Sequence, residues 1–400
     1  MEMSEIVIAG AVRTPFGKFG GTLKSFTLPH LGELVIKEAL QRANIPAADV
    51  EEVALGINLP GSDRSIARQA ALRAGVPDTT PAYTVDRACC SSMAAINLVS
   101  RALRLGDIQV GAAGGSENMS LVPYFVHDAR WGKRLGDIVL KDQLIISCPY
   151  SGKPRAVQAG EEAIEYGIGR EEQDRWAHRS HQRVATGQES GFFDAEILPV
   201  EVPQRKGPPV LFSKDEGVRP DTSLEKLARL RTVYDSPTVT PGNAPGLSTG
   251  AAAMVLTTSE EAERRGIEPL ATIQTWAMAA GHPDRIASIP AHAASKALDQ
   301  LGMSVDDPDL IEINEAFAAM PLVATHILGN GDPGKVAAIR EKTNVNGGAI
   351  AIGHPTGASG ARLVMTLAYA LKARGGGLGL AVICGGIGQG EAVIIRVPAN

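Results

Sequence analysis

Residues 93–115, MAAINLVSRALRLGDIQVGAAGG, contain in order a helical pattern, a glycine, a strand-like run and a pair of glycines. Apolar residues in the first half recur at helical spacing, and Gly106 marks the end of the predicted helix. The apolar run 108–113 is typical of a buried strand that finishes at Gly114-Gly115. The same order occurs again in residues 358–386, so the sequence predicts an internally duplicated fold.

Strand and helix patterns alternate through both of these regions. Such alternation predicts an α/β protein with a largely parallel sheet. Further strands are predicted at residues 5–11, 51–57, 81–85, 310–313, 378–384 and 392–397, and further helices at residues 30–43, 66–75 and 358–371.

The segment between the two regions, residues 119–248, has a different character. It contains Trp131, Trp176 and a strongly helical stretch at residues 170–189. Trp, Phe and Leu recur through it, which argues against a disordered linker, and we interpret it as a long insertion that covers the functional site. The predicted division is an N-terminal half at 1–118 completed by about 249–270, an inserted loop domain at 119–248, and a C-terminal half at 271–400.

The composition restricts the class of function. The 400 residues carry a formal net charge of -5, which argues against nucleic acid or an anionic membrane surface as a partner. No apolar run is long enough for a membrane span, and no signal-peptide pattern is visible. Four cysteines, two of them adjacent, fit reduced thiols better than a disulfide framework, so a cytoplasmic location is expected.

The eight histidines show no metal-ligand spacing with carboxylates or cysteines. We therefore predict no metal site. His178 and His181 lie in the polar helix and are expected to be solvated.

Three motifs far apart in the sequence carry the chemistry. Cys89 lies in VDRACCSSMAA (85–95), His354 in NGGAIAIGHPTGASG (346–360), and Cys384 begins CGGIG (384–388). Only the thiolate of a cysteine is nucleophilic, and Cys89 lies between a strand and the first turn of a helix, where the helix dipole favours negative charge. His354 would take its proton. The motifs together indicate acyl transfer through a thioester.

With these motifs the chain resembles the thiolases (acetyl-CoA acetyltransferases and 3-ketoacyl-CoA thiolases) over essentially its whole length. Other matching stretches support the resemblance, and together they are highly specific. They are RTPFG (13–17), ARQAA (67–71), GNAPG (242–246), GAAA (250–253) and NEAFA (314–318).

The resemblance implies a fold, an activity and an assembly. The implied fold has two duplicated βαβαβαββ halves in a five-layered α-β-α-β-α arrangement, with an inserted loop domain. The implied activity is CoA-dependent cleavage of a 3-ketoacyl-CoA, or the reverse Claisen condensation of two acyl-CoA molecules, through an acyl-cysteine. Coenzyme A is then a substrate, no cofactor is tightly bound, and the chain forms a homodimer or homotetramer.

The resemblance also assigns catalytic roles. Cys89 is the nucleophile, and Cys384 is the acid/base for the α-carbon. His354 and a water held by Asn314 form one oxyanion hole, and the backbone N–H groups of Cys89 and Gly386 form the other. A side chain at position 386 would obstruct that approach. Asn314 also suits the N-cap of a helix.

Implied contacts with coenzyme A and the acyl group lie mainly in the insertion. Arg219 matches a position that packs against the adenine, and Lys226 could attract the phosphates. Gln158 and Ala159 fall beside the acyl pocket, where a small residue at 159 would admit a chain longer than acetyl. Further residues implied at the substrate are Ala244, Gly246, Ser248, Ile286 and Phe317.

Three residues depart from the family pattern. Ser92 replaces a glycine, and Cys90 replaces Ser, Ala or Gly. Pro245 stands where many members have a serine that binds the pantetheine arm. Proline has neither N–H nor hydroxyl, so that contact is lost or passes to Ser248. These departures bear on coenzyme A affinity and substrate preference.

Two other readings remain open from the sequence. A β-ketoacyl synthase-like condensing enzyme would use Cys-His-His, and the motifs at Cys384 and Asn314 count against it. A non-catalytic acyl-CoA-binding scaffold subunit is the other alternative, and the intact Cys89, His354 and Cys384 count against that.

Overall fold

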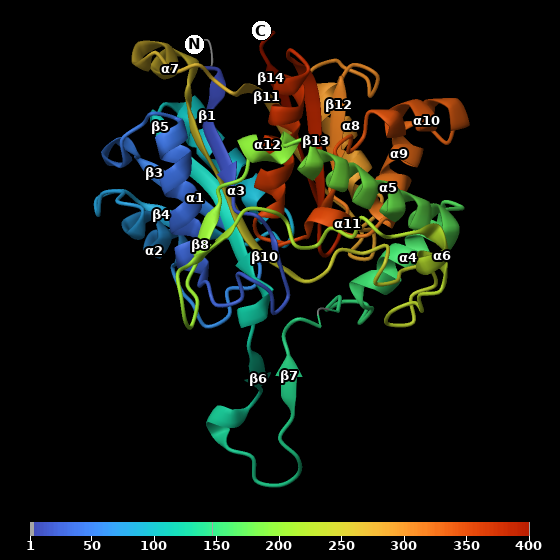
Figure 1. Ribbon diagram of the computed structural model, residues 1–400. Coiled ribbons are helices and arrows are strands. Elements are labelled where there is room, and N and C mark those ends of the chain that lie inside the picture. The colour runs from blue at the N-terminus through green and yellow to red at the C-terminus, as the bar shows by residue number, and fades with distance from the viewer. Residues whose placement is uncertain (1–3, 146, 400) are drawn as a thin grey trace.

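Two sheet regions with the same strand order form the body of the protein (Figure 1). The computed structural model describes residues 4–145 and 147–399. In the N-terminal region the order is β4-β3-β5-β10-β1, with β3 parallel to β4 and β5 and the other neighbours antiparallel. Its strands are β1 (Ile6–Arg13), β3 (Glu52–Gly56), β4 (Ala82–Val85), β5 (Val110–Asn118) and β10 (Ser248–Thr258), and the short β2 (Gly17–Lys18) pairs with β10.

The C-terminal region repeats this order. Its strands run β12-β13-β14-β11, and a parallel bridge from Ile311 to Thr343 stands where β4 stands in the first region. The pair β12–β13 is parallel, and β13–β14 and β14–β11 are antiparallel, as in the first region. The strands are β11 (Ala271–Ala280), β12 (Leu310–Ile313), β13 (Gly377–Gly385) and β14 (Gln389–Val397). The duplication predicted from the sequence is therefore visible in the topology, although the sheet is mixed rather than largely parallel.

Helices separate and cover the two regions, giving five layers (Figure 1). Helices α1 and α2 cover one outer face, α3 and α12 lie in the centre, and α8 and α9 cover the other outer face. β1 and β11 join the two sheets along one short ladder. The helices are α1 (Leu28–Arg42), α2 (Ile66–Arg73), α3 (Ser91–Leu105), α7 (Ser259–Arg265), α8 (Ile289–Gln300), α9 (Ala319–Leu328), α10 (Pro333–Glu341), α11 (Ala349–Ile352) and α12 (Ser359–Ala373).

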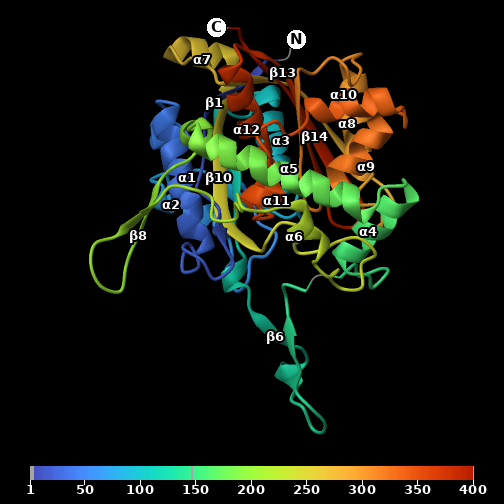
Figure 2. The same cartoon turned by 45° about the vertical axis from the view of Figure 1, so that its right-hand side comes forward.

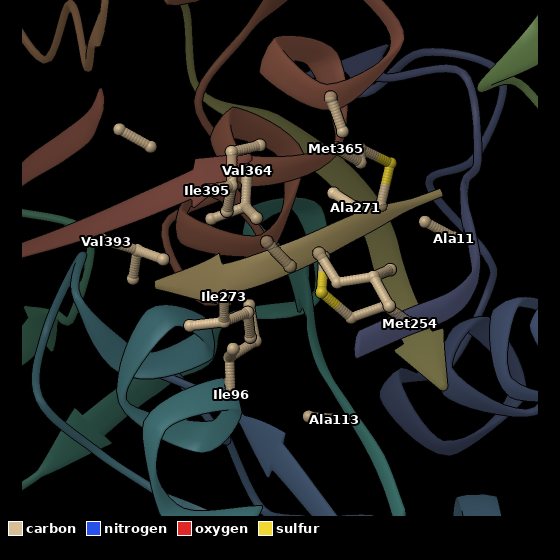
Figure 3. Close-up of a cluster of buried hydrophobic side chains, with 14 of the residues drawn as sticks. Ala11, Ile96, Ala113, Met254, Ala271, Ile273, Val364, Met365, Val393 and Ile395 are labelled. Atoms are coloured by element: carbon tan, nitrogen blue, oxygen red, sulfur yellow. The ribbon is translucent and has the colours of Figure 1, made fainter. Parts of the chain in front are cut away.

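The central helices have almost no face toward solvent. Figure 3 shows Ile96 of α3 and Val364 and Met365 of α12 packed with Met254 of β10 and Ile395 of β14, all of them fully buried. Apolar side chains on several sides of a helix are accommodated only where the helix lies between other elements. Each such side chain contributes about 1.5–3 kcal/mol by leaving water, so this layer holds the two sheets together.

The predicted end of one strand was wrong. β5 does not stop at Gly114-Gly115 but continues to Asn118. These glycines serve a close backbone approach instead: a β-carbon at Gly115 would lie 2.0 Å from the carbonyl oxygen of Gly357. Bare backbone at 115 lets the segment before α12 cross the strand.

The segment 119–248 covers the site only in part. Its helix α5 (Arg170–Glu189), with the bounds expected from the sequence, passes α11 on the body of the protein (Figure 2). The hairpin of β6 (Tyr124–Val126) and β7 (Leu140–Asp142) instead extends away from the body (Figure 1). The remaining elements are α4 (Arg155–Glu165), β8 (Val200–Val202), β9 (Val210–Phe212) and α6 (Leu224–Ala228). Among the described residues, no helix is long and apolar enough to cross a membrane.

The expectation that His181 is solvated was wrong. Its side chain is buried, and Nδ1 accepts a hydrogen bond from the backbone N–H of Arg219 at 3.2 Å. Burial lowers the pKa of His181 to about 4, so the ring is neutral at pH 7. His178, three residues earlier, is only partly buried.

A buried ion cluster fastens the insertion to the first strand. Arg13 at the end of β1 has no solvent exposure, and its Nε donates to Glu196 Oε1 at 2.6 Å. Its two terminal nitrogens donate to both oxygens of Asp215 at 2.7 and 2.9 Å. Asp215 also accepts from the N–H of Phe16 at 2.7 Å. Removing the cation would leave two carboxylates buried without compensation.

We therefore expect Arg13→Met to lower the free energy of unfolding by about 3–5 kcal/mol, measured by urea denaturation at one fixed protein concentration. Arg175→Met is the matched control, because Arg175 pairs with Glu171 on the surface at 2.9 Å and such pairs contribute about 0–1 kcal/mol. Equal losses in the two variants would contradict a special role for the buried cluster.

Candidate active site

The turn between β4 and α3 holds the nucleophile candidate. Ala88 has φ = +51°, which is unusual for a residue with a side chain and marks a sharp change of chain direction. The Ser91 hydroxyl accepts from the N–H of Arg87 at 2.9 Å and donates to the carbonyl of Ala88 at 2.6 Å. Because both ends of the turn are tied to one side chain, Cys89 is fixed at the start of the helix, partly buried and facing a cavity.

His354 lies just before the other central helix, α12. Its Nδ1 is 2.6 Å from Ser359 Oγ, and that hydroxyl donates its one hydrogen to the carbonyl of Pro355 at 3.0 Å. We therefore assign the proton of the ring to Nδ1, which donates to Ser359. The Nε2 lone pair is then free to accept, in agreement with Asn314 Nδ2 at 3.4 Å.

The two groups are uncharged at neutral pH. Burial raises the pKa of the Cys89 thiol to about 12, and the positive charge of Arg155 opposes this rise. Burial also lowers the pKa of His354 to about 3. The effect of burial therefore outweighs the helix dipole. A neutral thiol can react only if its proton moves as the sulfur attacks, so a base is required, and the neutral His354 lines the same cavity.

Cys384 lies near the end of β13, where a tight hairpin leads into β14. It is 4% exposed, and burial raises its thiol pKa well above the usual range. The hairpin turn has Ile387 at φ = +65° and Gly388 at φ = +65°. A β-branched residue in this region is strained. Within the described chain, the backbone N–H groups of Cys89 and Gly386 donate to no backbone carbonyl.

Asn314 directly follows β12 and is fixed from behind. The next residue, Glu315, is buried and accepts hydrogen bonds from Trp176 Nε1, Asn344 Nδ2, Ser180 Oγ and the N–H of Ile350, at 2.7–3.1 Å. Asn314 Oδ1 is buried and has no hydrogen-bond partner among the described residues. The alternative that Asn314 caps a helix was wrong, because α9 begins at Ala319 with Ala318 as its N-cap.

A second buried carboxylate, Glu117 of β5, holds the loop after His354. It accepts from the Thr356 hydroxyl at 2.7 Å and from the N–H groups of Gly357 at 3.0 Å and of Asn58 and Leu59 at 3.1 Å. Burial raises the pKa of Glu117 to about 7, while these hydrogen bonds oppose the rise. Sequence reasoning missed this residue, since only the fold brings its partners together.

One cavity of about 600 Å³ collects the candidate residues. Its wall is mostly apolar and includes a few polar groups, among them Cys89, His354 and Cys384. This composition is usual for ligand sites. Of the residues named from the sequence, it is lined by Cys89, His354, Cys384, Gly386, Ala244, Pro245, Gly246, Phe317 and Ile286.

Six other named residues, Asn314 among them, do not line this cavity. Ser248 supports it from behind, because its hydroxyl accepts from the N–H of His354 at 3.0 Å. Gln158 is buried and Ala159 has no exposure, so the suggestion that Ala159 faces the acyl group was wrong. One turn earlier on α4, Arg155 and Ala156 occupy the wall instead, and sequence reasoning missed both.

Arg219 and Lys226 are exposed and lie outside the cavity wall. Lys226 Nζ is 2.7 Å from Asp221 Oδ2 and also donates to its carbonyl at 2.7 Å. Their expected contacts with coenzyme A stay a prediction.

Two of the departures from the family pattern have packing roles. Ser92 Oγ accepts from the N–H of Ala361 at 3.0 Å, which joins the first turns of α3 and α12. Cys90 is fully buried, with Sγ 3.7 Å from the carbonyl of Ile383. No group of three His, Cys, Asp or Glu side chains in residues 4–145 and 147–399 is arranged to hold a metal ion.

The fold and this site define an α/β enzyme class in which a cysteine and a histidine face one cavity from two halves of a duplicated chain. Family models agree: "Thiolase, N-terminal domain" matches residues 6–260 and "Thiolase, C-terminal domain" matches residues 267–397. The chain belongs to the thiolase family.

Individual relatives match over nearly the whole chain. An acetyl-CoA acetyltransferase of Chromobacterium violaceum is 42% identical over 98% of this chain and 100% of its own length. The crystal structure of the Bacillus anthracis acetyl-CoA acetyltransferase has a TM-score of 0.94 at 40% identity and covers 99% of each chain. Human mitochondrial 3-ketoacyl-CoA thiolase has a TM-score of 0.93 at 38% identity, over 98% of this chain and 99% of that one.

The raised pKa of Cys89 predicts how its alkylation depends on pH. Because only the thiolate reacts, we expect the rate of iodoacetamide labelling at Cys89 to rise roughly tenfold per pH unit from pH 7 to pH 10, followed by peptide mapping. An ordinary cysteine levels off above its pKa of about 8.5. A plateau below pH 8 would instead indicate a preformed thiolate–imidazolium pair.

Proposed function

We propose that the protein is an acyl-CoA C-acyltransferase that cleaves a 3-ketoacyl-CoA with coenzyme A, or condenses two acyl-CoA molecules in reverse. The observation that supports this most is that Cys89, His354 and Cys384, from three distant segments, line a single cavity. One thiol can carry the acyl group between the two acyl transfers, and the imidazole can take the proton of that thiol. The second thiol can supply or take the proton at carbon. Full-length similarity to acetyl-CoA acetyltransferases supports the same reaction.

In the first half-reaction the sulfur of Cys89 bonds to C3 of the 3-ketoacyl-CoA as its proton passes to His354 Nε2. The C2–C3 bond then breaks, and its electron pair takes a proton from Cys384, so acetyl-CoA leaves. The acyl group remains on Cys89 as a thioester.

In the second half-reaction the thiol of coenzyme A attacks this thioester. Its proton passes to Cys384, which was left as a thiolate. His354 returns its proton to the sulfur of Cys89. All groups then regain their starting protonation states, and the product is an acyl-CoA shortened by two carbons.

Oxyanions form in both half-reactions and need donors that already point at them. The N–H groups of Cys89 and Gly386, which donate to no backbone carbonyl of the described chain, support one such hole. For the other, His354 would act with a water that Asn314 holds through its unpartnered Oδ1. Ala244, Gly246 and Phe317 would contact the pantetheine arm, while Arg219 and Lys226 would contact the adenine and phosphates.

We further propose a homo-oligomer, a cytoplasmic location and the domain division given above. The hairpin of β6 and β7 supports an oligomer, because it presents apolar side chains to solvent. Exposed fractions reach 85% for Trp131 and 87% for Leu135. Such patches mark contact surfaces in folded proteins.

The direct test is incubation with acetoacetyl-CoA and free coenzyme A. Formation of two acetyl-CoA per substrate supports the proposal. Binding without turnover would instead support the scaffold alternative, and activity only with a carrier-bound acyl donor would support a condensing enzyme of the synthase type.

Cys89→Ala is expected to abolish acyl-enzyme formation, because no other thiol in the cavity stands at a helix start beside His354. Mass spectrometry after incubation with acetyl-CoA should show an added acetyl group on the wild type only. Cys90→Ala is the matched control: its sulfur points into the core, so acetylation should persist. Acetylation of Cys89→Ala at the wild-type rate would rule out this nucleophile.

Cys384→Ser should separate the two steps. A hydroxyl is a far weaker acid than a thiol, so proton transfer at the α-carbon should slow by roughly 100-fold or more, while acetylation of Cys89 by acetyl-CoA persists. Acetylation and steady-state thiolysis are measured on the same preparation. Equal losses in both would indicate that Cys384 is a structural residue.

A further inference from the structure

Arg155, the first residue of α4, places a cation in the wall of the cavity that contains Cys89 and Cys384. Its guanidinium lies against the hairpin after Cys384, because a β-carbon added at Gly386 would be 3.1 Å from Arg155 Nη2. The charge is close enough to Cys89 to favour its thiolate. The cation therefore lies beside the reacting sulfur, where an acyl group would be attached.

A chain of polar groups, of which Gln158 is buried, holds this side chain in place. Arg155 Nη1 donates to Gln158 Oε1 at 2.9 Å. The amide nitrogen of Gln158 donates to Asp284, and Ser151 Oγ donates to the same carboxylate oxygen at 2.6 Å. Because Asp284 can only accept, it fixes the orientation of the Gln158 amide and turns the carbonyl oxygen toward Arg155.

No carboxylate of the described chain forms an ion pair with Arg155. The other arginine in the wall, Arg87, pairs with Glu391 and is thereby neutralised. Asp86 also borders the cavity, but its Oδ1 is engaged by the N–H of Ala88 at 2.9 Å. Gln158 satisfies one donor of Arg155 without neutralising its charge. A partly buried guanidinium with free donors is suited to a carboxylate, which it can bind through two parallel hydrogen bonds.

We propose that the preferred substrate is a 3-ketoacyl-CoA whose acyl chain ends in a carboxylate, and that Arg155 binds this carboxylate. The inference rests on the proposed thiolase function and deepens it. After C2–C3 cleavage the part of the substrate beyond C3 stays attached to Cys89, in the cavity whose wall Arg155 shares. Bonds and protons follow the two half-reactions above, and the second product is the mono-CoA thioester of a dicarboxylic acid.

The test compares two six-carbon 3-ketoacyl-CoA substrates that differ only at the far end, one a carboxylate and the other a methyl group. Acetyl-CoA release gives kcat/KM for each with the full-length protein. Binding through a charged hydrogen-bonded pair predicts that the wild type prefers the carboxylate by roughly 10-fold or more. Arg155→Met should lower this preference at least about 10-fold, and Arg155→Lys should retain part of it.

Lys153→Met is the matched control, because Lys153 is two residues away, pairs with Glu161 at 2.6 Å and does not line the cavity. Its ratio of the two kcat/KM values should equal that of the wild type. Gln158→Met tests the supporting contact and keeps the proposal testable if Arg155→Met does not fold. It should lower the ratio, mainly through KM for the carboxylate substrate.

Two results would overturn the inference. One is a wild type that cleaves acetoacetyl-CoA yet favours the methyl-ended substrate. The other is an Arg155→Met variant that slows both substrates equally and also slows iodoacetamide labelling of Cys89, which would mean that the cation only favours the thiolate. Failure of the wild type on acetoacetyl-CoA and both test substrates would instead reject the proposed thiolase function.

Discussion

The packing of the two central helices, α3 and α12, between the two sheets is the constraint on which the rest of the structure depends. Helices in this position bury side chains on nearly every side, and the polar ones among them, such as Asn97 and Arg362, are buried as well. Gly115 provides a very close backbone contact where the loop before α12 crosses β5. Since Cys89 and His354 directly precede these helices, the packing that builds the core also brings the two groups to one cavity.

Two buried carboxylates, Glu117 and Glu315, fix the loops of the site through hydrogen bonds. Glu117 collects four donors around the segment after His354, and Glu315 collects four donors behind Asn314. Carboxylates in such places are stable only when their hydrogen bonds are satisfied. They fix the loops, while His354 lines the cavity and Asn314 behind it keeps a buried oxygen without a partner among the described residues. The framework is therefore rigid at the places where the chemistry needs fixed geometry.

Local patterns in the sequence were sufficient for most elements of the fold. Helical spacing with Gly106 gave α3, whose C-cap glycine has φ = +77°, and the bounds of α5 were correct to the residue. Errors arose where tertiary contacts decide the outcome. Gly114-Gly115 looked like a strand end because the crossing segment is more than 200 residues away. His181 looked solvated because its hydrogen-bond partner, the N–H of Arg219, is 38 residues away in the chain.

Within the site, motifs located Cys89, His354 and Cys384, whose neighbours in sequence are distinctive. They did not locate Arg155, because an arginine at a helix start usually lies in solvent and only the turn of α4 shows which residues face inward. The resemblance placed Ala159 in the cavity wall, but the residues of α4 in the wall are Arg155 and Ala156, about one helical turn earlier in the chain. Periodicity fixes the face of a helix only when its bounds are known, and those of α4 follow an irregular segment.

Because the two repeats have the same strand order, each has a corresponding position before its central helix, and these two positions carry different side chains of the candidate active site. Cys89 stands before the central helix of the first repeat, and His354 stands before the central helix of the second, so the two groups occupy equivalent places. Two identical chains related by a twofold axis would carry the same side chain at both places. Joining the repeats in one chain lets the two places differ, so that one supplies sulfur and the other imidazole.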